Sequence, residues 1–214
     1  MSQMSQEFDE EEQMALEAVK MSSLRKRINA KGWSNHMEDI MKSWGEKAAG
    51  NREMHDAAAS KWKKFSDRIY IPVIFLSTIA GVGNFGAASI EDNEYWMYGI
   101  GVINIFSAFI ASLMKYYRPD EKQQAHRFIA RNFGSYYRQM TLELGMSRED
   151  RMGPDELVKF AKNDYDRLLK DAPSLPGDVV EDFKRKHKTE DNLPDVALTN
   201  FEIKVYGRND ENVL

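Results

Sequence analysis

The chain of 214 residues contains no cysteine. It can therefore form neither a disulfide framework nor a thiolate metal site. It has only four histidines, and they are scattered without the spacing of metal ligands: His36, His55, His126 and His187. The sequence also lacks a phosphate-binding loop, a GxSxG motif, an HExxH motif and a convincing pair of catalytic carboxylates. We therefore expect no catalytic residue, no metal and no cofactor, and we predict that the protein is not an enzyme.

The chain also lacks any large excess of positive charge. Its 30 Lys and Arg residues are outnumbered by 34 Asp and Glu residues, which gives a net charge of −4. This balance argues against a general nucleic-acid-binding protein. The N-terminal sequence MSQMSQEFDEEEQ is acidic and has no apolar core, so it does not predict a secretory signal.

Charge is missing altogether from two adjacent segments, residues 69–90 and 95–114. A helix needs about 20 apolar residues to cross the hydrocarbon core of a bilayer. An ionisable side chain at the centre of such a helix would cost roughly 2.5–3.5 kcal/mol. The sequence therefore predicts an all-α protein with transmembrane helices at about 70–88 and 96–114. A buried helical hairpin in a soluble protein is the alternative.

The charges beside these segments predict their orientation. Basic residues flank the pair on its outer sides: Lys61, Lys63, Lys64 and Arg68 come before it, and Lys115, Arg118 and Lys122 come after it. The connection between the segments carries Glu91, Asp92 and Glu94 and no basic residue. By the positive-inside rule, both termini of a two-span membrane protein with this pattern lie in the cytosol.

Small and polar residues recur within the two segments. Glycines can let membrane helices pack closely, and the candidates are Gly81, Gly83, Gly86 and Gly101. The polar candidates are Ser77, Asn84, Asn104 and Ser107. One interpretation is that these polar side chains form hydrogen bonds between packed helices. The other is that they line a water-filled path through an oligomer, with Glu91, Asp92 and Glu94 around its outer mouth attracting cations.

Helical periodicity continues outside the two segments. Before the first span, positions spaced alternately by four and three residues form a heptad seam: Met37, Met41, Trp44, Ala48, Asn51, His55, Ala58, Trp62, Phe65 and Ile69. One helix from about Asn35 into the membrane is therefore predicted, kinked at Pro72 unless a new helix starts there. After the second span, a second seam is predicted to pack on the first: Ile129, Phe133, Tyr136, Met140 and Leu144. Within the first seam, Asn51 and His55 are expected to set the register, and pH sensing by His55 is the alternative.

Breaks in this pattern divide the chain into four parts. Residues 1–34 are predicted to be an acidic tail with a short amphipathic helix, whose LRKR sequence would lie against lipid headgroups. Residues 35–146 would form the two-transmembrane hairpin with its cytosolic helical extensions. Residues 147–188 would form C-terminal helices, because Gly145 to Pro154 breaks the preceding helix. Residues 189–214 would be a polar tail.

The order of these features resembles a known family. The features that carry the resemblance are SWGEKAAGNREMHDAAASKW before the first span, RIYIPVIFLSTIAGVGNFGA within it, and AHRFIARNFGSYYRQM and YDRLLKDAPSLP after the hairpin. Over about residues 35–177 the chain resembles the SLATT family, the SMODS and SLOG-associating two-transmembrane effector domains. The resemblance implies an all-helical membrane protein that oligomerises, forms a pore when triggered, works with a nucleotide-sensing partner protein and has no enzymatic site.

Two functions follow from the sequence. The first is a homo-oligomeric, pore-forming or membrane-perturbing effector. The second is a membrane-anchored scaffold, such as a virion or cell-membrane component, that binds partners through its cytosolic helices.

Overall fold

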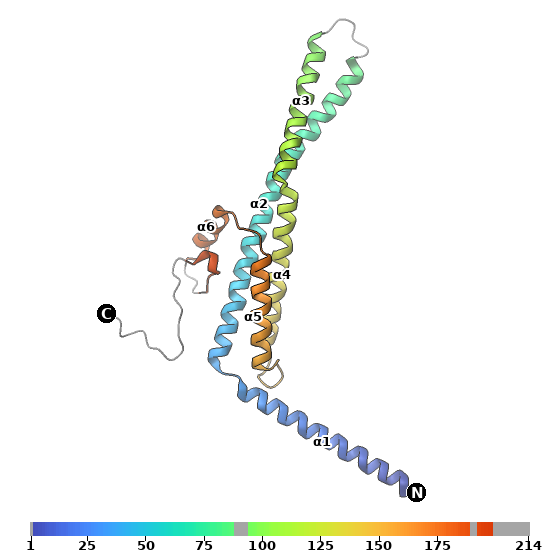
Figure 1. Ribbon diagram of the computed structural model, residues 1–214, viewed down its shortest axis with the longest axis vertical. Helices are drawn as coiled ribbons and strands as arrows, with labels where there is room; N and C mark the ends of the chain where they lie inside the picture. The colour runs from blue at the N-terminus through green and yellow to red at the C-terminus, as the bar shows by residue number, and fades with distance from the viewer. Residues whose placement is uncertain (1, 88–93, 189–191, 199–214) are drawn as a thin grey trace, which may run out of the picture.

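The computed structural model describes residues 2–87, 94–188 and 192–198, and it is an all-α fold without strands in those ranges (Figure 1). Its elements are α1 (Ser2–Gly32), α2 (Asn35–Ala87), α3 (Glu94–Tyr117), α4 (Pro119–Gly145), α5 (Pro154–Asp171), α6 (Gly177–Lys186) and the 3₁₀ turn η1 (Asp195–Ala197). The predicted all-α class is therefore confirmed. The sequence that follows residue 198, including TNFEIKVYG, lies outside the described residues.

Helix α2 has 53 residues and a length of about 80 Å, and the other helices of the bundle and the hairpin pack along it. It starts at the predicted residue, because the Ser34 hydroxyl accepts a hydrogen bond from the Met37 N–H at 3.2 Å and so caps the first turn. It then continues through Pro72. No new helix starts at the proline, so the predicted long helix is correct.

A break separates α3 from α4 at Arg118, which the sequence pattern did not predict. Arg118 has φ 45° and ψ 53°, the left-handed conformation. The following Pro119 disfavours the α conformation for the residue before it. The chain therefore leaves one helix at Arg118 and starts the next at Pro119, where a missing N–H does no harm.

We expect Arg118→Gly to stabilise the protein by about 1 kcal/mol, because glycine adopts the left-handed conformation without the cost that other residues incur. Lys115→Gly, placed inside α3, should instead destabilise it by about 1 kcal/mol. Thermal unfolding of both variants in detergent measures the difference. Equal destabilisation by the two glycines would contradict this account of the break.

The core lies where α2, α4 and α5 pack side by side (Figure 1). The buried residues of this cluster are Trp33, Met41, Ala48, Ile129, Phe133, Tyr136, Met140, Leu157, Ala161, Tyr165 and Leu168. They include Met41 and Ala48 of the α2 seam and four of the five α4 positions predicted to oppose it, and the partly buried Met37 and Trp44 of the same seam pack against them. The predicted packing of the two seams outside the hairpin is therefore confirmed, with α5 as a third helix beside them.

The C-terminal segment packs on α2 as a second, smaller cluster. Val179 and Phe183 of α6 and Ala197 of η1 are buried together with Met54 and Ala58 of α2. Residues 192–198, part of the sequence expected to form a polar tail, thus contribute to the fold.

Helix α1 leaves the bundle at the end opposite the α2–α3 hairpin (Figure 1). Its last turns are held there by an ion pair between Lys26 and Asp150 (2.7 Å) and by a hydrogen bond from the Asn29 side chain to the Arg151 carbonyl (2.7 Å). About 35 residues of α2, or roughly 50 Å, separate this end from the start of the first apolar segment. The placement argues against the expected contact of LRKR with the bilayer that the hairpin would cross.

Candidate functional site

The hairpin of α2 and α3 extends beyond the bundle (Figure 1). Many of its apolar side chains are exposed. Two helical segments, one in α2 and one starting at Glu94, are long and apolar enough to cross a membrane, and only 11% and 17% of their most apolar stretches are buried. Val82 and Ile105, for example, are 69% and 73% exposed. The core helices of a soluble protein would bury such side chains.

The two helices contact each other along a narrow interface. Ala80 of α2 and Ile100, Ser107 and Met114 of α3 are buried there. Gly83 permits a close approach, because a Cβ atom at this position would lie 2.9 Å from Ile100 Cδ1. The indole N–H of Trp96 donates a hydrogen bond to the Gly83 carbonyl at 3.3 Å.

The other predicted packing glycines do not contribute to this interface. A Cβ atom at Gly81 or Gly101 would meet no other atom within 4 Å. Gly86 lies where only the helix backbone is described. Of the predicted outer-mouth residues, Glu91 and Asp92 lie outside the described residues, and Glu94 is exposed at the first position of α3.

Three of the four predicted polar residues, Ser77, Asn84 and Asn104, are exposed. The fourth, Ser107, is buried in the α2–α3 interface, and its hydroxyl has no hydrogen-bond partner among the described residues. The two asparagines therefore do not bond each other across the hairpin of a single chain. Their amides are directed to whatever surrounds the hairpin.

The exposed polar residues nevertheless share one side of the hairpin. Tyr70 of α2 and Ala111 of α3 line the same groove, of about 550 Å³, near the bundle end of the hairpin. Seven residues make about two helical turns, so residues spaced by seven lie on one face of a helix. Ser77 and Asn84 follow Tyr70 at this spacing, and Asn104 precedes Ala111 by it. The three polar side chains thus extend this one side toward the tip.

The opposite side of the hairpin is bulky and apolar. A second groove of about 560 Å³ lies there, and its walls include Ile79 and Val82 of α2 and Gly99 and Ile103 of α3. Phe106, two turns after Gly99 on the same face, is also exposed. The hairpin therefore has one face with polar and small residues and one face suited to lipid chains.

A buried histidine pair lies between α2 and α4, below the hairpin. The Nδ1 atoms of His55 and His126 are 2.9 Å apart, and the two side chains are almost wholly buried. One ring must carry its proton on Nδ1 and the other must accept with a free Nδ1 lone pair. Burial, with a smaller contribution from His126, lowers the pKa of His55 to about 4, and burial also lowers the pKa of His126. At neutral pH the pair is therefore uncharged, and its hydrogen bond joins the α2 and α4 helices.

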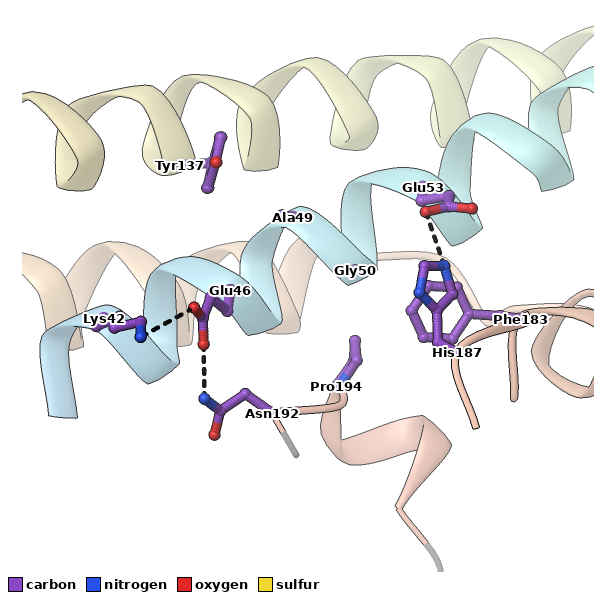
Figure 2. A pocket seen from close by; sticks show the side chains of 10 residues that line it. All are labelled: Lys42, Glu46, Ala49, Gly50, Glu53, Tyr137, Phe183, His187, Asn192 and Pro194. Atoms are coloured by element: carbon purple, nitrogen blue, oxygen red, sulfur yellow. Dashed lines mark hydrogen bonds and ion pairs between the residues drawn. The ribbon is translucent and has the colours of Figure 1, made fainter. Parts of the chain in front are cut away.

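A groove of about 450 Å³ separates the middle of α2 from the C-terminal segment (Figure 2). Figure 2 shows His187 against Glu53 and Asn192 against Glu46. His187 Nε2 lies 3.1 Å from Glu53 Oε2, and Asn192 Nδ2 donates a hydrogen bond to Glu46 Oε2 at 2.6 Å. Lys186 also donates to Glu53. Both oxygens of the Glu53 carboxylate are thus used to hold α6 on α2. Within the described ranges, no cluster of three or more His, Cys, Asp or Glu side chains could hold a metal ion.

Gly50 leaves no room for a larger side chain in this groove. A Cβ atom there would lie 2.5 Å from Pro194 Cγ and 3.1 Å from Phe183 Cζ. We expect Gly50→Ala to displace η1 and α6 at a cost of about 1–3 kcal/mol. Proteolysis at the C-terminal segment should become several times faster than in the wild-type protein.

Gly45→Ala is the matched control for this prediction, because Gly45 lies in the same helix as Gly50. A Cβ atom at Gly45 would lie 3.4 Å from Met140 Cβ of α4, an ordinary van der Waals contact. Unchanged proteolysis in Gly50→Ala, or equal acceleration in both variants, would show that Pro194 does not pack as described.

Sequence reasoning missed a polar cluster that joins the bundle end of α2 to the α4–α5 connection. Arg151 is buried, donates to Glu38 Oε1 at 2.7 Å and to the Met146 carbonyl at 2.7 Å, and lies over the Trp33 ring. Arg148 donates to the other oxygen of Glu38 at 2.7 Å. The sequence shows only the charged run SREDR at residues 147–151, which does not identify Glu38 as a partner.

No protein-family model, curated protein sequence or solved structure matches this chain, so the geometry of the hairpin and of the bundle below it carries the functional conclusion.

Proposed function

We propose that the chain is an integral membrane protein with two spans, α3 and the second part of α2, that oligomerises through the polar face of its hairpin and forms a conducting path. The observation that carries the proposal is the uncovered apolar surface of the hairpin, with 11% and 17% of its most apolar stretches buried. Lipid is the environment that such a surface requires. The function agrees with the pore-forming activity implied by the resemblance to the SLATT family.

The two-faced hairpin supports oligomerisation. Lipid chains can cover the face with Ile79, Val82 and Phe106, but exposed asparagine amides in hydrocarbon need polar partners. A second copy or a water-filled path supplies those partners. Gly81 and Gly101, which have no neighbouring atoms at their Cβ positions, leave room for another helix to approach this side.

The charge pattern supports cytosolic termini. A membrane-impermeant maleimide should label Tyr95→Cys at the tip of the hairpin in intact cells and should not label Ser23→Cys in α1. The chain has no native cysteine to interfere. Labelling of Ser23→Cys but not Tyr95→Cys would reverse the proposed topology.

Two measurements test the proposal directly. The full chain should stay in the membrane fraction after an alkaline carbonate wash, and release into the supernatant would contradict the membrane assignment. The purified protein, reconstituted in vesicles, should conduct ions and elute from detergent as an oligomer. A protein that is retained by membranes, monomeric and silent would contradict only the pore.

A membrane-anchored scaffold is the second candidate, favoured by the exposed apolar side chains of α1 outside the hairpin. In this case the hairpin only anchors the bundle, and a partner binds the cytosolic helices. Cross-linking distinguishes the two functions. Links between hairpins of several copies favour the pore, and links from the cytosolic helices of a monomer to another protein favour the scaffold.

A further inference from the structure

Helix α1 divides its charges into two halves. Residues 2–19 hold six acidic residues and no basic one, and residues 20–32 hold five basic residues and no acidic one. Such a helix repels a parallel copy of itself, because like charges would lie side by side. It attracts an antiparallel copy, because each acidic half would lie along a basic half.

An apolar stripe runs along the same helix. Met14, Met21 and Ile28 are spaced by seven residues, about two turns, and are 63%, 66% and 63% exposed. Leu24 lies beside them and is also exposed. These side chains, with Ala18, line or extend a groove on α1 that nothing in the described chain fills.

The bundle does not cover the apolar stripe of Met14, Met21 and Ile28. The ion pair of Lys26 and the hydrogen bond of Asn29, which tie α1 to the bundle, both lie in its last turns. A helix without tertiary packing is only marginally stable in water. The part of α1 before Lys26 therefore needs a partner that covers Met14 and Met21.

We propose that this partner is α1 of a second copy, packed antiparallel and centred near Met21. Centring at Met21 places Met14 of one copy opposite Ile28 of the other and brings each acidic half beside a basic half. An anionic bilayer fits less well, because it would repel the acidic half and because α1 joins the bundle at the end away from the hairpin. This contact goes beyond the hairpin contacts of the proposed function and does not require a conducting pore.

Single cysteines in the full-length protein test the pairing, because the chain has none of its own. A disulfide needs Cα atoms about 4.4–6.8 Å apart. Under mild oxidation, Met21→Cys alone should give a covalent dimer, with at least tenfold more dimer than the matched control Ser23→Cys on the opposite face of α1. Met14→Cys and Ile28→Cys should not dimerise separately, but the two proteins expressed together should form a mixed disulfide.

Self-linking of Met14→Cys as strong as that of Met21→Cys would overturn the antiparallel arrangement. A Met21→Cys yield no higher than that of Ser23→Cys would overturn the pairing itself. Glu17→Lys, which breaks the charge division, should lower the Met21→Cys yield several-fold at low salt, and an unchanged yield would also count against the proposal. Circular dichroism of each variant confirms that the bundle is folded, and membrane retention and conductance are measured separately.

Discussion

Replacing Asn104 with leucine is expected to lower the ion current through reconstituted vesicles at least tenfold. Asn104 is exposed on the polar face of the hairpin, on the same side as Asn84 and Ser77. In a conducting oligomer its amide would replace water around a passing ion or hold a neighbouring helix in position. Leucine offers neither hydrogen bond, so the path would lose a polar wall or close.

Phe106→Leu is the matched control, because Phe106 lies on the apolar side of the same helix, and its current should stay within about twofold of the wild-type value. Asn104→Gln should retain a measurable current, since it keeps the amide. A current unchanged by Asn104→Leu, or lowered equally by Phe106→Leu, would contradict a path along the polar face.

Lowering the pH from 7 to 5 is expected to reduce the free energy of unfolding by about 2 kcal/mol through His55. Burial lowers the pKa of His55 to about 4 in the folded protein, so the unfolded chain binds more protons between about pH 6.5 and pH 4. The stability is therefore complete above pH 6.5 and is lost as the pH falls through this range. Protonation of the accepting ring would also break the 2.9 Å hydrogen bond to His126.

Thermal unfolding in detergent between pH 7 and pH 5 checks this result. The double variant His55→Gln/His126→Gln should be less stable at pH 7 but should lose several-fold less stability on acidification. A wild-type protein that becomes more stable as the pH falls, or a double variant with the same pH dependence, would contradict a neutral buried pair.

The two seams outside the hairpin could be predicted because burial follows the helical repeat. Phe133 and Met140 had to lie on the same face of one helix, and Met41 and Ala48 on the same face of another. The absence of charge indicated the two segments of the hairpin in the same way.

Contacts between distant residues could not be predicted, because periodicity gives a face but not its partner. His55 meets His126 across 71 residues only because the hairpin connection and the break at Arg118 set the axial position of α4 against α2. The same limit hid the packing of Pro194 on Gly50. Periodicity likewise could not show that Asn84 and Asn104 share a side of the hairpin without touching each other.

Spin labels placed one at a time along α3 in lipid vesicles test the central claim most directly. At Val102, Ile105 and Phe109 the labels should collide readily with dissolved oxygen and hardly at all with a water-soluble nickel complex, as side chains in hydrocarbon do. Labels at these positions that collide readily with the nickel complex would place the hairpin in water and contradict the account.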